Sequence, residues 1–176
     1  NHSVYDVRIT IPDNYIVGSG GILIEESVSG TDEKTKTLYY RAEDIVDFAW
    51  TAWPGYEVFI DQWNHVSITL LVPEERTNQV ERQFTAVKNA LEFFAENVGP
   101  YPWPHLTFVD PPQKGSGAGG MEYTTLFTSQ SSDRMPSWFH LPESVTVHEF
   151  GHAYFMGIMA TNEFEEPWMD EGMNSF

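Results

Sequence analysis

The sequence contains no cysteine, so neither disulfide bonds nor thiolate metal ligands can contribute to its structure or chemistry. Positive charge is also scarce: 9 lysines and arginines stand against 26 aspartates and glutamates, which gives a net charge of −17. Such a surface repels phosphate backbones, and no basic patch occurs, so the composition argues against nucleic-acid binding. The sequence has no run of about 18 apolar residues, so it predicts no membrane-spanning helix.

The residues that are present predict a folded globular protein, with 41% hydrophobic and 15% aromatic residues. Up to residue 72, short apolar runs alternate with turn residues, which predicts a β-sandwich or saddle. Three tryptophans in this part are expected to pack between strands. The predicted strands are 4–11, 16–17, 22–24, 36–41, 56–60 and 66–72, a polar turn is predicted at 29–33, and the tryptophans are Trp50, Trp53 and Trp63.

The pattern changes at Pro73, where we place a domain boundary between residues 1–72 and 73–176. Two glutamates follow the proline, as in a first helical turn, and apolar residues then recur every three or four positions up to Gly99. This spacing predicts one helix of about 25 residues with a single apolar stripe. The stripe consists of Val80, Phe84, Val87, Leu91, Phe94 and Val98.

After this helix the sequence predicts a buried strand at 105–110, a glycine-rich loop at 111–120 and an edge strand at 121–128. The loop lacks the lysine–serine ending of a phosphate-binding loop, so nucleotide binding is not predicted. Its glycines would let a substrate backbone approach the edge strand closely. Strands in the first part, followed by a mixture of helices and strands, predict the α+β class.

Two histidines with metal-ligand spacing, His148 and His152, occur in the sequence His-Glu-Phe-Gly-His. Pro142 fits the first turn of a helix and Gly157 its end, so both histidines lie on one helical face and can bind one cation. Glu149 lies further round the helix, where it can reach a water on that metal. The alternative is a surface helix that carries two histidines without a metal. His140, eight residues before His148, is expected to be a surface group.

A third ligand is available nineteen residues after His152, where Glu171 stands in the sequence Trp-Met-Asp-Glu-Gly. Catalytic zinc takes three protein ligands and keeps an open position for water, and two histidines with one glutamate meet this need. The predicted zinc ligands are therefore His148, His152 and Glu171. Glu149 is the predicted general base that activates the zinc-bound water.

These motifs resemble those of the aminopeptidase N family of zinc metallopeptidases, which belongs to the gluzincins. The resemblance rests on the zinc motif with its distant glutamate and on Gly119-Gly120-Met121-Glu122-Tyr123 upstream. It extends to residues 42–50 and 99–104, and so covers most of the chain. One position departs from the family pattern, because Tyr123 stands where the family usually has asparagine.

The resemblance implies a β-rich N-terminal domain followed by the first part of a thermolysin-like catalytic domain. It also implies a Zn²⁺-dependent aminopeptidase that hydrolyses N-terminal peptide bonds. Glu122 would bind the free α-ammonium group of a peptide substrate, beside Gly119, Gly120 and Met121. The tyrosine that this family uses to stabilise the oxyanion does not occur after Glu171. Two other functions stay open on the same scaffold: an epoxide hydrolase and a non-catalytic interaction domain.

The sequence begins at Asn1 and ends at Phe176, five residues after Glu171, and both ends are expected to be cut from a longer protein. A helix as short as the one that carries Glu171 is marginal without packing partners. We therefore expect the chain alone to bind zinc weakly, or to lack it, and to be poorly active. Side-chain preference, oligomeric state and cellular compartment are not predicted.

Overall fold

The computed structural model describes residues 1–29, 34–132 and 134–175, so most of the turn predicted at 29–33 lies outside the described residues. The protein contains both sheets and helices, which confirms the predicted α+β class. The strands are β1 (Ser3–Pro12), β2 (Ile16–Ser19), β3 (Ile22–Val28), β4 (Thr35–Ile45), β5 (Trp50–Trp53), β6 (Tyr56–Trp63), β7 (Val66–Pro73), β8 (His105–Val109), β9 (Met121–Tyr123) and β10 (Leu126–Thr128). The helices are η1 (Glu74–Gln79), α1 (Val80–Asn97), η2 (Gln113–Ala118), α2 (Leu141–His152), η3 (Ala153–Ile158), η4 (Pro167–Met169) and α3 (Glu171–Ser175).

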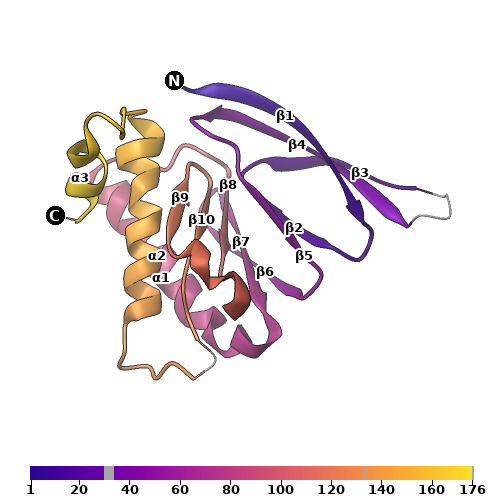
Figure 1. Ribbon diagram of the computed structural model, residues 1–176. Helices are drawn as coiled ribbons and strands as arrows, with labels where there is room; N and C mark the ends of the chain where they lie inside the picture. The colour runs from indigo at the N-terminus through magenta and orange to yellow at the C-terminus, as the bar shows by residue number, and fades with distance from the viewer. Residues whose placement is uncertain (30–33, 133, 176) are drawn as a thin grey trace.

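A five-stranded sheet in the order β6-β7-β8-β10-β9 forms the centre of the molecule (Figure 1). The pairs β7–β8 and β8–β10 are parallel, whereas β6 and β9 run antiparallel to their neighbours at the two edges. The middle strands β7 and β8 are mostly buried, with successive buried residues from Leu70 to Pro73 and from Leu106 to Val109, as expected of strands covered on both faces. The edge position of β9 matters for function, because its outer side is free of strand neighbours among the described residues.

Helices α1 and α2 cover one face of this sheet (Figure 1). The predicted stripe packs there except for Val98, which follows the end of α1 and is 55% exposed. Phe84, Leu91 and Phe94 are buried against side chains of the sheet and of α2. Aromatic rings fill this core, and the Phe94 ring stacks on that of Tyr154 with a centroid distance of 4.7 Å. The packing of α1 against α2 fixes the helix that carries the histidine motif.

The opposite face of the central sheet is covered by the two-stranded sheet β2–β5. There Trp53 packs edge-on against Tyr56, with ring centroids 5.2 Å apart. A third sheet, β1-β4-β3, extends away from the helices and buries its own small cluster around Leu38 and Tyr40 (Figure 1). The strand β5 was not predicted from the sequence. Trp50 within it is 48% exposed, so its expected packing between strands is wrong, while Trp53 and Trp63 do pack against apolar neighbours.

The chain enters the central sheet at β6, after the strands of the two smaller sheets, and not at the boundary predicted near Pro73. Strands β6 and β7 precede Pro73, yet they pair in one sheet with β8, which follows it. The main core likewise combines residues from both sides of this position. The change in sequence pattern at Pro73 therefore marks the start of a helix within one packed unit.

Three predicted elements differ in detail. The helix predicted at 74–98 is split into the 3₁₀-helix η1 and the α-helix α1, and the buried Arg76 side chain of η1 binds Asp110. The edge strand predicted at 121–128 is a hairpin, β9–β10, with a turn at residues 124–125. Helix α2 continues as the π-helix η3, which ends at Ile158, one residue after the predicted stop at Gly157, and the chain turns at Ala160, whose φ is +50°.

Candidate metal centre

Helix α2 places both histidines on one face. Pro142 and Glu143 occupy its first turn, as predicted, and Arg82 of α1 binds Glu143 with two contacts of 2.8 Å. The Nε2 atoms of His148 and His152 lie 3.3 Å apart. Their nitrogens therefore face a common point beside the helix.

Glu171, the first residue of α3, completes this group. Its Oε2 lies 3.3 Å from Nε2 of His148 and 3.7 Å from Nε2 of His152. In a tetrahedral zinc site with bonds of about 2.0–2.1 Å, neighbouring ligand atoms are about 3.3–3.4 Å apart. Two of the three separations match this spacing, and the third is slightly longer. Two imidazoles and one carboxylate in this arrangement fit a zinc ion with one open position.

A buried aspartate fixes the orientation of the His152 imidazole. Oδ1 of Asp170 lies 2.5 Å from Nδ1 of His152, and the two residues are 2% and 0% exposed. We assign the proton to Nδ1, which donates it to the carboxylate, so Nε2 carries a free lone pair. Asp170 was not among the site residues predicted from the sequence. Its position directly before Glu171 is the only signal that the sequence offers for it.

Helix α3 is attached to α2 through a glycine and an asparagine. The side-chain amide of Asn174 donates a hydrogen bond of 2.6 Å to the carbonyl oxygen of His148. A Cβ atom at Gly151 would overlap the side chain of Asn174, so only glycine allows this contact. Because α3 has no buried residue and Glu171 is 58% exposed, this contact is important for the position of the third ligand.

Glu149 projects from α2 as a buried carboxylate beside the ligand group. It is 7% exposed, and its Oε2 has no hydrogen-bond partner among the described residues. Burial, followed by the negative charge of Glu122, raises the pKa of Glu149 from its ordinary 4.5 to about 7, although His152 acts in the opposite direction. Such a carboxyl group can accept and release a proton near neutral pH.

The edge strand β9 brings Glu122 to this carboxylate. Glu122, Glu149 and His152 each offer a ligand atom within 4.8 Å of the others. The backbone must come close here, because a Cβ atom at Gly120 would overlap the carboxylate of Glu149. Gly119 has a φ of +58°, a left-handed conformation that favours glycine. Of the predicted substrate residues, Gly120 and Glu122 thus lie directly beside the predicted base.

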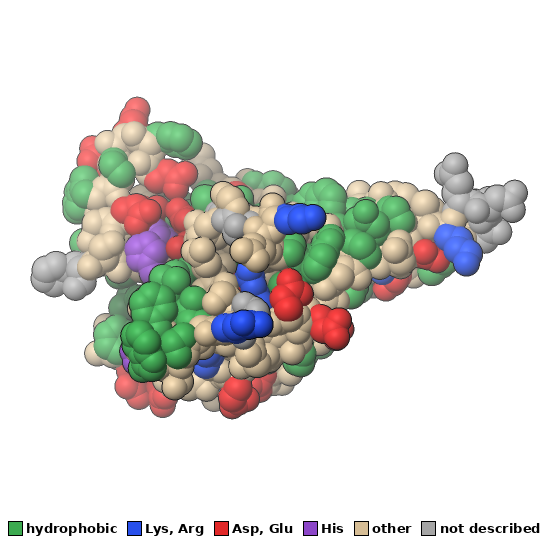
Figure 2. Space-filling view, turned by 60° about the horizontal axis from the view of Figure 1, so that its bottom comes forward, with side chains coloured by type: hydrophobic (Ala, Val, Ile, Leu, Met, Phe, Trp, Pro, Cys, Tyr) green, Lys and Arg blue, Asp and Glu red, His purple; other side chains and the backbone are tan. Residues whose placement is uncertain are grey.

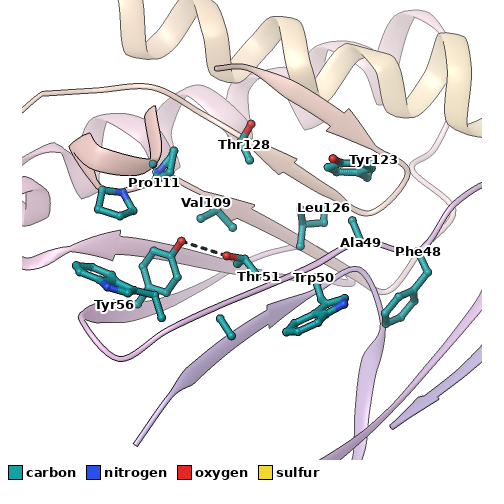
Figure 3. A pocket seen from close by; sticks show the side chains of 14 residues that line it. Phe48, Ala49, Trp50, Thr51, Tyr56, Val109, Pro111, Tyr123, Leu126 and Thr128 are labelled. Carbon is teal, nitrogen blue, oxygen red and sulfur yellow. Dashed lines mark hydrogen bonds between the residues drawn. The ribbon is translucent and has the colours of Figure 1, made fainter. Parts of the chain in front are cut away.

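Tyr123, the next residue along β9, points to the opposite face of the sheet. It lines a cavity of about 580 Å³ between β5, η2 and the β9–β10 hairpin (Figure 3). Trp50 and Tyr56 also line this cavity, and the hydroxyl groups of Tyr56 and Thr51 lie 3.3 Å apart in a hydrogen bond. None of the described residues that line the cavity is charged, in contrast to the candidate metal centre. Met121, at the start of β9, is 36% exposed.

The surface around the histidines is acidic. Figure 2 shows aspartate and glutamate side chains gathered around histidine at the end of the molecule opposite the β3–β4 hairpin, with no lysine or arginine among them. His140 does not belong to this group. Its side chain is 71% exposed and lies 3.8 Å from Glu143 at the start of α2.

Comparison of the chain with models of known protein families and with curated protein sequences finds no match. None of the helices in residues 1–29, 34–132 and 134–175 has the length and apolar character needed to cross a bilayer. The case for a function therefore rests on the side chains of the site.

Proposed function

We propose that this protein is a zinc-dependent aminopeptidase that acts on peptides with a free N-terminus. The observation that carries the proposal is the convergence of His148, His152 and Glu171 at tetrahedral zinc distances, with a buried carboxylate, Glu149, beside them. Two imidazoles on one helix face can occur on any helix. A carboxylate at the right separation as third ligand, and an aspartate behind the imidazole of His152, are not expected of an ordinary surface helix.

His148, His152 and Glu171 would hold the ion. When bound, zinc polarises the carbonyl of the scissile bond and lowers the pKa of a nearby water to about 7. Glu149 accepts the proton of the attacking water and passes it to the leaving amine. Its burial supports this role, because a carboxylate with few hydrogen bonds of its own is free to accept one from water.

Glu122 accepts hydrogen bonds from the α-ammonium group of the substrate. The outer side of β9 can pair with an extended peptide through main-chain hydrogen bonds, with the N-terminus of the peptide at Glu122. A peptide in this position would be cut next to its first residue, because Glu122 lies within reach of Glu149. Binding of the α-ammonium group by Glu122 would therefore make the enzyme an exopeptidase and not an endopeptidase.

The test combines zinc content with two matched peptide substrates, one with a free N-terminus and one N-acetylated. At saturating zinc the wild type should bind one equivalent and release the first residue of the free peptide alone, although with the low turnover expected of this chain. Glu149→Gln should bind zinc equally and lose that turnover. Failure of the wild type to bind zinc even at saturating concentration, or equal cleavage of the acetylated peptide, would refute the proposal. Hydrolysis of an epoxide without peptide cleavage would point to the other hydrolase considered above.

A further inference from the structure

The β9–β10 hairpin, which carries Glu122, is attached to the rest of the molecule at its turn. Thr124, the first residue of this turn, is 1% exposed. Its backbone N–H and its side-chain hydroxyl each donate a hydrogen bond of 3.1 Å to Oδ1 of Asp47. The same hydroxyl accepts a hydrogen bond of 3.2 Å from the backbone N–H of Val46. Three hydrogen bonds therefore join the turn to the segment between β4 and β5.

Thr124 also contacts the helix that continues from the histidine motif. A Cβ atom at Gly157 of η3 would lie only 3.1 Å from Cγ2 of Thr124, so the methyl group of Thr124 packs against the backbone of η3. Helix η3 follows α2 without a break, so the turn lies against the continuation of the helix that carries both histidines. Thr124 is thus held between Asp47 on one side and this helix on the other.

Glu122 lies midway between two points at which the hairpin contacts the helices. Residues two apart on an extended strand face the same side, and Gly120, Glu122 and Thr124 have this spacing. Gly120 lies against the carboxylate of Glu149 in α2, and Thr124 lies against Gly157 in η3. The carboxylate between them belongs to the same group as Glu149. The two contacts therefore fix the position of Glu122 relative to the predicted base.

Few other contacts hold β9 at this distance from the helices. The strand has three residues, and its only strand neighbour among the described residues is β10. The second turn residue, Thr125, donates its hydroxyl hydrogen bond to the carbonyl of Gly20, just after β2. Asp47, in contrast, binds the turn residue that contacts η3. A carboxylate oxygen that accepts two donors from one residue fixes the backbone and the side chain of that residue together.

We propose that Asp47 is a positioning residue, which holds Thr124 against η3 and thereby keeps Glu122 at its distance from Glu149. The inference rests on the proposed function for its effect on peptide cleavage, whereas the attachment of the hairpin does not depend on that function. Without the Asp47 carboxylate the turn loses two of its three hydrogen bonds to this segment, so β9 should move relative to α2. A displacement of about 1 Å in a substrate-binding group can cost about 100-fold in rate.

The first experiment is amide hydrogen exchange, followed by NMR on the 176-residue chain, and it needs no substrate. In Asp47→Ala the amides of Thr124 and β9 should exchange about tenfold faster or more, while those of α1 keep their rates. Thr124→Val keeps a methyl group at Gly157 and removes the hydroxyl, so it should accelerate the same amides less, and it carries the test if Asp47→Ala does not fold. Asp44→Asn, at an exposed aspartate three residues earlier, is the matched control. Unchanged exchange in the turn and β9 would overturn the inference.

The second experiment measures kcat/KM for a peptide with a free N-terminus at saturating zinc, with the chain in excess because its turnover is low. Asp47→Ala should lower kcat/KM about 10–100-fold and leave zinc affinity within about twofold. Asp47→Asn keeps an oxygen that can accept both hydrogen bonds, so kcat/KM should return to within about threefold of the wild type. Equal losses in Asp47→Asn and Asp47→Ala would show that the charge of Asp47 acts and not its hold on Thr124, which would overturn the inference.

A double variant shows whether Asp47 acts through Glu122. In a Glu122→Ala background, Asp47→Ala should have little further effect on kcat/KM, because the group that it positions is gone. Additive losses would assign Asp47 a general structural role and would also overturn the inference. If amide exchange changes as expected but the wild type cleaves no peptide, the attachment of the hairpin by Asp47 stands and the proposed function fails.

Discussion

Replacement of Gly151 by alanine tests how the third metal ligand is held in place. Gly151 lies in α2 at the point where α3 crosses it, and a new methyl group would overlap the side chain of Asn174. Asn174 would have to move, and its hydrogen bond to the carbonyl of His148 would be lost. Because Glu171 belongs to the same five-residue helix, it should move with Asn174.

The expected effect is a loss of zinc affinity without a loss of fold. Outer contacts that orient a ligand typically contribute about 10–100-fold to metal affinity, so Gly151→Ala should weaken zinc binding by about that factor. Alanine favours a helix over glycine by about 1 kcal/mol, and this gain offsets part of the steric cost in the metal-free chain. The free energy of unfolding without zinc should therefore change by only about 1 kcal/mol.

Zinc affinity is measured by competition with a chromogenic chelator, and stability by urea denaturation in excess chelator. Gly115→Ala is the matched control, because the nearest atoms to its new methyl group lie 3.6 Å away. In an Asn174→Ala background the overlap is gone, so Gly151→Ala should have no further effect on zinc affinity. Zinc binding by Gly151→Ala within about twofold of the wild type, or additive losses in the double variant, would refute the reasoning.

Three further predictions concern the base, the buried ion pair and pH. His152→Ala should lose zinc, whereas Glu149→Gln should keep it and lose about 10²–10⁴-fold in turnover; equal zinc loss would show that Glu149 is a ligand. Arg76→Ala removes the guanidinium group that lies 2.6 Å from the buried Asp110. The free energy of unfolding, measured by urea denaturation, should fall by about 3–5 kcal/mol, and a change near zero would contradict this. In the metal-free chain the folded state raises the pKa of Glu149 to about 7, so the free energy of unfolding should fall as pH rises from about 4.5 to about 7. The fall should be smaller in Glu149→Gln, and identical pH profiles of the two proteins would contradict the raised pKa.

The regular parts of the fold could be predicted because they follow local periodicity. The alternating sequence of β1 and the three-four spacing of α1 each bury one face, and both elements occur where the sequence predicts them. The change of sheet between β5 and β6 could not be found this way. It depends on the pairing of β7 with β8, which are separated by more than thirty residues, and local pattern carries no information on such pairing.

The candidate site, like the fold, could be predicted from the sequence only in part. The spacing of His148 and His152 places both side chains on one helix face, and the structure brings Glu171 to them. The groups around them come from distant segments, and no pattern in the sequence marks them. Asp170 is one of 26 acidic residues in the chain, and only the folded structure places it behind the imidazole of His152.

The glycines before β9 show how one sequence feature serves a role that the sequence alone does not reveal. The sequence suggests that they admit a substrate backbone, yet at Gly120 the space a side chain would need already contains the carboxylate of Glu149. Gly120 therefore lets the edge strand approach the helix, and this approach places Glu122 against Glu149. If the strand stood one side chain further out, the carboxylate proposed to bind the amine and the proposed base could not contact one substrate. In the proposed function, the separation between Glu122 and Glu149 would set the cut at the first peptide bond.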